Sequence, residues 1–254
     1  MICPQCGNQV NDGAAFCTNC GMNFAQPSNP QYQAPPRPHI GPTIGESYRM
    51  ALDVIAKKPF RLWGLSLMNG LLTILASLFG VLPIISLPII FALEVGMHAI
   101  YLDGIRGKEV NSDQLFLGFK GFFRFAGGMG WMYLWVLIWS LIPFVGFIFA
   151  IIKTYSYRFV PYILLSDPEV SATEALRRSM RETRGMRGKM FGADILISAG
   201  VFVVTLILSL LSSIRYVGVI FLILEVLFVI AVCIFMPLFV GLVNAAFYDK
   251  KPNA

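Results

Sequence analysis

Charged residues are scarce in this chain. Asp, Glu, Lys and Arg make up 13% of the 254 residues, where about a quarter is usual in soluble domains. Hydrophobic residues make up 56%, against roughly 45–50% in soluble domains. Too few charges remain to cover the surface of a soluble globule. The composition and the long apolar runs described below therefore predict an all-α polytopic membrane protein.

Histidine and the common catalytic motifs are also missing or rare. The chain has only two histidines, and it contains no HExxH, no GxSxG and no glycine-rich phosphate loop. This absence favours a protein that is not an enzyme. The N-terminus lacks the basic start and apolar core of a cleavable signal peptide, so none is expected.

Four of the five cysteines lie close together, in the stretches CPQCG and FCTNCG. The spacing Cys3-x2-Cys6 and Cys17-x2-Cys20 suits a tetrahedral Zn²⁺ site of four thiolates. A segment of about twenty residues cannot bury a sufficient core, so the metal would supply its folding energy. Two disulfides are the alternative, which the paired spacing and a reducing compartment disfavour.

Residues 1–24 resemble the short zinc ribbon found at the N-terminus of many prokaryotic proteins. Such a site is structural, because its four thiolates leave no open position on the metal. The next residues, 25–43, are rich in proline and predict an extended tether. His39 lies in this tether and is expected to be solvated. Cys233 lies in an apolar run and is predicted to be a small core residue.

Residues 44–250 contain the predicted membrane domain. Their apolar runs are about 62–80, 82–102, 125–165, 191–213 and 217–243. As one helix, the third run would be ~60 Å long, about twice the hydrocarbon core. The stretch LIPFVG (141–146) predicts a reversal that divides this run into spans 125–142 and 144–165, giving about six spans. The alternative is one span that leaves the membrane at Lys153.

The distribution of basic residues favours six spans. With the N-terminus in the cytoplasm, all 20 Lys and Arg residues lie in cytoplasmic segments except Lys153, Arg158 and Arg215. The single-span alternative moves the six basic residues of 177–189 outside, against the positive-inside tendency. We therefore predict a multipass membrane protein with both termini in the cytoplasm. The resemblance of residues 1–24 to prokaryotic zinc ribbons implies that this membrane is the prokaryotic plasma membrane.

Two segments that precede spans are predicted to be interfacial helices. Residues 44–60 place apolar side chains at helical spacing, and residues 166–190 contain a capping box, Ser171-x-x-Glu174. Their basic residues would attract anionic lipid headgroups. The alternative for 166–190 is a basic loop that only sets topology. Nucleic-acid binding is not expected, because no helix-turn-helix pattern accompanies the basic residues.

A shift of 128 residues aligns Glu46 with Glu174 and Gly64 with Gly192. Few of the aligned positions are identical. An internal repeat and a chance match therefore both stay open.

Ionisable residues inside the predicted spans form a candidate polar cluster of Glu94, His98, Lys153, Arg158, Asp194 and Glu225. Each costs about 2.5–3.5 kcal/mol at the bilayer centre, so they should face inward and pair. We expect Glu94 or Glu225 to pair with Lys153 or Arg158. The cluster is interpreted either as a salt-bridge network that fixes helix packing or as a polar pathway for an ion, a proton or a headgroup.

Three stretches carry a resemblance: YRFVPYILLSDPEVSATEALRRSMRETRGMRGKMF, FMPLFVGLVNAAFYDK and LIPFVGF. They are similar to a bacterial multipass family called domain of unknown function 975. More loosely, they resemble the membrane domain fused to some glycerophosphodiester phosphodiesterases. The matching positions are Pro161, Tyr162, Glu174, Ser179, Gly185, Phe191, Pro237, Phe247 and Tyr248. The chain departs from the family at Thr183, where methionine is favoured, and at Arg187, where lysine is. The resemblance spans roughly 44–250 and implies a six-span bacterial membrane protein without an established activity.

These observations give two functional hypotheses. The first is a non-enzymatic scaffold or regulator whose cytoplasmic zinc ribbon docks a protein partner. The second is a transporter or lipid-handling protein that uses the intramembrane cluster.

Overall fold

The computed structural model describes residues 41–78, 83–214 and 218–251, together with five positions near the N-terminus (2, 9–11 and 14). The chain divides into a unit Met1–His39 and a unit Ile40–Ala254. In the first unit, Ile2 and Gln9 form an isolated antiparallel bridge. The predicted zinc ribbon and tether otherwise lie outside the described residues.

The described part of the second unit is helical, as predicted, and contains no β-strand. Its elements, in order, are α1 (Ile44–Lys57), α2 (Pro59–Leu78), α3 (Pro83–Ile105), the 3₁₀ helix η1 (Ser112–Phe116), α4 (Leu117–Lys120), α5 (Phe122–Ser140), α6 (Gly146–Tyr157), α7 (Val160–Ser166), α8 (Ala172–Glu182), α9 (Arg187–Ser212) and α10 (Gly218–Asp249).

Helix α3 lies at the centre of this unit and packs on α2, α5, α7 and α10. Two glycines allow its closest contacts. A Cβ atom at Gly96 of α3 would collide with the backbone carbonyl of Leu115, and a Cβ at Gly118 would collide with that of Ala92. The segment η1–α4 can therefore lie directly against α3 only because these two positions lack side chains.

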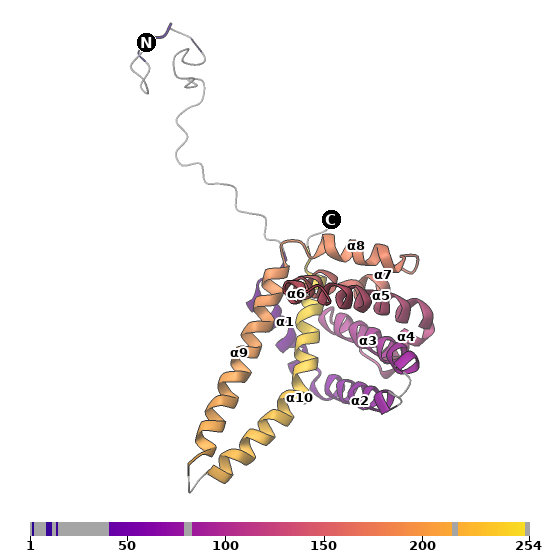
Figure 1. Cartoon of the computed structure of the whole chain (residues 1–254), viewed down its shortest axis with the longest axis vertical. Helices are drawn as coiled ribbons and strands as arrows, with labels where there is room; N and C mark the ends of the chain where they lie inside the picture. Colours follow the sequence, from indigo (N-terminus) through magenta and orange to yellow (C-terminus); the bar gives the residue numbers. More distant parts are fainter. Residues whose placement is uncertain are drawn as a thin grey trace. The chain divides into compact units, whose positions relative to one another are not determined.

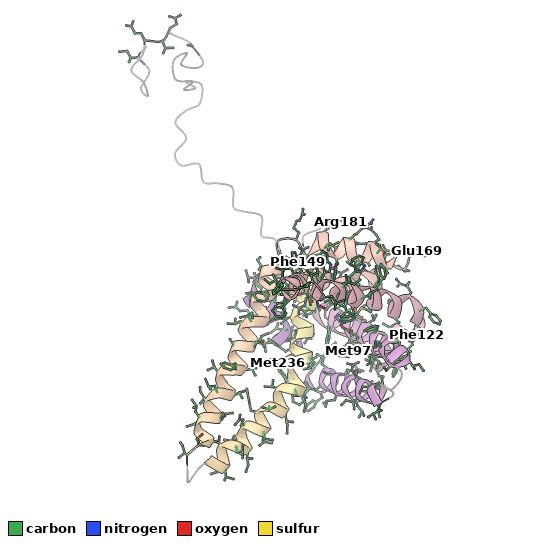
Figure 2. The ribbon with its side chains drawn as sticks, viewed as in Figure 1. Met97, Phe122, Phe149, Glu169, Arg181 and Met236 are labelled. Carbon is green, nitrogen blue, oxygen red and sulfur yellow. The ribbon has the colours of Figure 1, made fainter. Side chains whose placement is uncertain are left out.

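The C-terminal half of α9 and the N-terminal half of α10 extend away from the other helices of this unit (Figure 1). The two helices pack on each other, and Pro237 lies inside α10. Figure 2 shows the side chains crowded among α3, α5 and α7, whereas those of the distal halves of α9 and α10 project outward. Cys233 lies on this part of α10 and is exposed, so the prediction of a core cysteine is wrong. Its neighbours are apolar and suit contact with lipid.

Helix α1 begins with a complete capping box. The Thr43 hydroxyl accepts from the backbone N–H of Glu46 (3.2 Å), and the Glu46 carboxylate accepts from the backbone N–H of Thr43 (2.7 Å). The Tyr48 hydroxyl donates to the carbonyl of Ala193 in α9 (2.6 Å). Burial, and secondarily the charge of Asp194, raise the pKa of Tyr48, so this hydroxyl remains a donor at neutral pH.

The long apolar run 125–165 is divided by a turn. Helix α5 ends at Ser140 and α6 begins at Gly146, and the two helices pack on each other. Within the turn, Phe144 has a φ of 64°, a left-handed conformation that is costly for a bulky residue. A Cβ on Gly146 would crowd the carbonyls of Trp139 and Ser140, which explains the glycine in LIPFVG.

Five helical segments are long and apolar enough to cross a membrane: Phe60–Leu78, Ile85–Ile105, Gly146–Ser166, Arg187–Ser212 and Gly218–Asp249. They agree closely with five of the six predicted spans, and the chain is a membrane protein by this criterion. Helix α5, which corresponds to the predicted span 125–142, is not among them. It carries three tryptophans, a tyrosine and Arg124, which lower its mean hydropathy.

The apolar faces of the two predicted interfacial helices contact protein. In α8, Ala175, Leu176 and Ser179 are buried, and the helix packs on α5 and α7. In α1, Ser47 and Ala51 are buried. An interfacial helix inserts its apolar face into the lipid boundary, so this part of the prediction is wrong for α8. In α1, Ile44, Tyr48 and Ile55 are partly buried against the core, whereas Leu52 is exposed, so for this helix the interfacial position stays a prediction.

Ion pairs tie the C-terminus to α8. Glu182 accepts from Arg178 one turn earlier (2.9 Å) and from Lys251 after α10 (2.6 Å). The Glu182 side chain is only 6% exposed, so both pairs are partly shielded from water. The hydrogen bond to Glu182 raises the pKa of Arg178.

We expect Gly96→Ala to lower the thermal stability of the purified protein. The added methyl group must displace the Leu115 backbone, and overpacking of this kind costs about 1–3 kcal/mol. Gly64→Ala is the matched control, because a Cβ at Gly64 in α2 meets no atom within 4 Å. Alanine there should leave the melting temperature equal or slightly higher. Equal melting temperatures for both variants would contradict the close contact between α3 and η1.

Candidate functional site

A cavity of about 460 Å³ with polar and apolar lining residues lies among α2, α3, α5, α6, α7 and α10. It is the best candidate site in the part of the chain that the structure describes. Its hydrogen-bonding lining includes Asn69, Glu94, His98, Tyr133, Arg158 and Asn244. Methionines such as Met97 contribute apolar surface (Figure 2). Three of the six residues of the predicted cluster, Glu94, His98 and Arg158, therefore line one cavity.

Glu94 and His98 lie one turn apart on α3, so both side chains reach the cavity. The Tyr133 hydroxyl of α5 lies 3.0 and 3.1 Å from the two carboxylate oxygens of Glu94 and donates to them. His98 Nδ1 lies 2.7 Å from the backbone carbonyl of Glu94. A carbonyl can only accept, so Nδ1 carries the proton. The neutral ring then has its acceptor at Nε2.

Arg158 pairs with Asp194. The Nη2 atom of Arg158 lies 2.7 Å from Oδ2 of Asp194, and the two side chains are 18% and 22% exposed. Tyr155 donates to the same carboxylate oxygen (2.9 Å), and its ring lies 4.7 Å from the guanidinium carbon. Asp194 lies two turns into α9, so this pair links α9 to the break between α6 and α7.

The predicted partners of these charges were wrong. Arg158 was expected to pair with Glu94 or Glu225. Arg158 instead lies after the last residue of α6, where the chain bends into α7, and this position directs it toward α9. Position along a predicted span does not determine the direction in which the guanidinium points.

Lys153 does not belong to the cavity. Its Nζ lies 4.8 Å from the ring centre of Trp139, 5.8 Å from that of Tyr157 and 3.9 Å from the Met180 sulfur. Aromatic faces can hold an ammonium group in this way without a carboxylate. Glu225 lies in the distal part of α10 and has no ion pair among the described residues. Neither residue forms the predicted pair.

The break between α6 and α7 is completed by side chains in and just after α8. Ser179 accepts from the backbone N–H of Phe159 (3.2 Å) and donates to the carbonyl of Ser156 (2.8 Å). The hydroxyl of Thr183, the residue after α8, donates mainly to the Ser179 carbonyl (2.8 Å) and lies 3.3 Å from the Ser156 carbonyl. A break in an apolar segment leaves backbone groups that water cannot reach, so they need such partners.

Sequence reasoning missed Tyr101, Tyr133 and Asn244 of the cavity lining. Each is a polar residue inside an apolar run, which is also the signal that pointed to Glu94 and His98. Tyrosine is also common at membrane interfaces, so this signal alone does not separate a cavity residue from an interfacial one.

The four predicted zinc ligands, Cys3, Cys6, Cys17 and Cys20, lie outside the described residues. Close to them in sequence are the bridge between Ile2 and Gln9 and a turn in which the backbone N–H of Ala14 donates to Asn11 (3.2 Å). In the described part of the chain, no three His, Cys, Asp or Glu residues form a group that could hold a metal.

We expect Arg158→Met to destabilise the protein more than Lys153→Met. Removing Arg158 leaves the Asp194 carboxylate with only a tyrosine, and an uncompensated buried charge costs up to about 3–5 kcal/mol. Lys153 has no carboxylate partner, so its removal strands no charge. The double variant Arg158→Met/Asp194→Asn should recover part of the lost melting temperature. The loss of melting temperature in the double variant is compared with the losses in Arg158→Met and Asp194→Asn alone. If the double loss equals the sum of the two single losses, these residues do not interact.

Comparison with known proteins identifies the N-terminal module. Residues 2–24 match the family model of the zinc-ribbon domain, which confirms that prediction and indicates that the protein binds zinc. The matched model does not extend into the membrane part, so the resemblance of residues 44–250 to the two membrane families stays an interpretation of the sequence. No curated protein and no solved structure matches the chain. The chain is thus a membrane protein that carries a zinc-ribbon module.

Proposed function

We propose that this protein is a non-enzymatic scaffold or regulator of the prokaryotic plasma membrane, whose cytoplasmic zinc ribbon docks a protein partner. The zinc-ribbon match at residues 2–24 is the observation that carries this proposal. The ribbon precedes a proline-rich stretch and a set of long apolar helices. A small metal-stabilised module on an extended tether can reach a partner beyond the membrane surface.

Cys3, Cys6, Cys17 and Cys20 would hold the Zn²⁺ ion. Four thiolates complete its tetrahedral coordination and leave no position for a substrate or water. The metal in such a site supplies folding energy. A closed, metal-stabilised module without an open coordination site suits recognition of a partner better than chemistry.

The proposed topology has six spans and depends on α5. Its 19 residues span about 28 Å as a helix, close to the thickness of the hydrocarbon core. Its packing on α3 and α6 supports a position among the other spans. With α5 as a span, both termini and the basic segment 177–189 lie in the cytoplasm, in agreement with the positive-inside tendency.

Anionic lipid headgroups are the proposed partners of α8. Arg177, Arg181 and Arg184 are exposed there, and basic side chains beside a cytoplasmic leaflet each gain about 1 kcal/mol from anionic lipid. The buried apolar face of α8 means that this contact would be electrostatic only. Nothing in the proposal requires a nucleic acid.

A second candidate function is transport or handling of a small polar molecule or lipid. The cavity lined by Glu94, His98 and Arg158 favours it, because polar groups inside apolar helices are costly unless they have a function or a complete set of partners. This function would be compatible with a docked regulator at the zinc ribbon.

We expect the purified protein to hold about one zinc ion per chain, and Cys3→Ser to lose it because three thiolates do not complete the site. The variant should also lose its captured partner, while the membrane part unfolds at an unchanged temperature. Zinc is measured by elemental analysis and the partner by cross-linking in cells, with Cys233→Ser as the control. Unchanged partners after loss of zinc would refute docking and leave the second candidate.

Labelling of introduced cysteines tests the topology, in a chain whose native Cys233 is replaced by Ser. A membrane-impermeant thiol reagent added outside intact cells should label cysteines placed at Phe144 and Ser213. It should miss cysteines placed at Asp113, Arg181 and Asn253. Arg181 is exposed at the surface of α8, so external labelling at position 181 would mean that α5 does not cross the membrane.

A further inference from the structure

The cavity contains one negative charge that no described cation balances. The Arg158 guanidinium is already paired with Asp194 at 2.7 Å. Lys153 lies against aromatic rings outside the cavity lining. Glu94, which lines the cavity, accepts hydrogen bonds from the Tyr133 hydroxyl and forms no ion pair with any described residue. The side chains of Glu94, Arg158 and Asp194 together carry a net charge of about −1.

A second acceptor faces the same space. The Oδ1 atom of Asn69 is buried and has no hydrogen-bond partner among the described residues, and Asn69 lines the cavity from α2. A buried acceptor without a partner costs free energy, so Oδ1 would be stabilised by a ligand that donates an N–H or O–H. A positively charged hydrogen-bond donor would satisfy both the Glu94 carboxylate and the Oδ1 atom of Asn69.

Among the described residues, the cavity lining also contains one hydrogen-bond donor without a partner, which by itself would favour an anionic ligand. The Nη1 atom of Arg158 is buried without a partner in the described part of the chain. An anion bound there would lie beside the Asp194 carboxylate, which already neutralises the guanidinium. It would also add a negative charge to a cavity that contains Glu94. The balance of charge therefore favours a cation over an anion.

The rest of the lining suits an apolar group attached to that cation. The rings of Tyr101 and Tyr133 border the cavity, and so do Met129 and Met132. Tyrosine rings attract an ammonium group across their faces, and methionine side chains adapt to apolar ligands of different shapes.

We propose that this cavity binds an organic ammonium ion, with Glu94 and Oδ1 of Asn69 holding the ammonium group and the tyrosine and methionine side chains contacting its apolar part. The proposal rests on the second candidate function and names its class of ligand. It is independent of the zinc ribbon.

The test uses four probes of similar size and different charge. 2-Phenylethylamine is a cation at neutral pH, 2-phenylethanol is neutral, phenylalanine is a zwitterion and 3-phenylpropionate is an anion. Their binding to the full-length protein in detergent is measured by isothermal titration calorimetry. We expect 2-phenylethylamine to bind most tightly, because it alone adds a positive charge without a negative one. Phenylalanine should bind more weakly, since its carboxylate would lie near Asp194 or Glu94.

Two variants connect binding to the named atoms. Glu94→Gln should weaken binding of 2-phenylethylamine by at least about tenfold, because a charge pair shielded from water is lost. Asn69→Leu removes only the amide and should weaken it by about threefold to tenfold, the effect of one hydrogen bond. Glu225→Gln is the matched control, since it removes an acid of the apolar helices that does not line the cavity. It should leave the affinity unchanged. Thermal unfolding of each variant confirms that it is folded.

Several results would overturn the proposal. Equal binding of 2-phenylethanol, or unchanged affinity in folded Glu94→Gln and Asn69→Leu variants, would show that the charge is not recognised. Tighter binding of 3-phenylpropionate, lost in Arg158→Met, would replace the ammonium ligand by an anion and keep the ligand-handling function. Binding of none of the four probes would refute the ammonium site and remove the support for the second candidate function.

Discussion

The ion pair between Arg158 and Asp194 is the interaction on which the arrangement of the membrane unit depends. A bilayer offers no water to charged side chains, so a guanidinium at the bend between α6 and α7 must find its partner within the protein. That partner, Asp194, is on α9, and Tyr155 and Tyr48 reach the same region from α6 and α1. The contact therefore joins the long α9–α10 hairpin to the helices around the cavity. The additional hydrogen bond from Tyr155 offsets part of the free-energy cost of removing this ion pair from water.

The same requirement explains how the backbone is interrupted without loss of stability. The chain bends between α6 and α7, and Ser179 of α8 and Thr183 just after it bond to the backbone groups of Ser156 and Phe159. Helix α8 is thus a structural part of the membrane unit, with its apolar face against protein and its arginines exposed. The backbone groups have their partners and Arg158 is paired with Asp194 through Nη2, whereas Glu94 has no cation and Asn69 Oδ1 no hydrogen-bond donor beside it among the described residues. This contrast separates the structural charges from the candidate binding residues. The Nη1 atom of Arg158 also has no hydrogen-bond partner in that part of the chain.

Much of this fold could be predicted from the sequence, because the signals were local. The length and composition of the apolar runs located five segments within a few residues, and the stretch LIPFVG marked the turn before α6. The paired CxxC spacing identified the zinc ribbon. The partners of the buried charges could not be predicted in this way. The acidic partner of Arg158 depends on the direction of its side chain after the end of α6 and on the packing of α9. Neither can be read from the position of a residue along a predicted span. The burial of the α8 apolar face was missed for a similar reason, since an amphipathic pattern does not distinguish a lipid surface from a protein surface.

The most direct test of this account is a solid-state NMR distance measurement on the full-length protein in lipid bilayers. Nitrogen-15 in the arginine guanidinium groups and carbon-13 in the aspartate and glutamate carboxyl groups are recoupled, and Asp194→Asn assigns the signal. The account predicts strong dipolar coupling between Arg158 and Asp194, consistent with the 2.7 Å contact between Nη2 and Oδ2. Its absence, with Arg158 coupled instead to a labelled glutamate that Glu94→Gln or Glu225→Gln removes, would contradict the account.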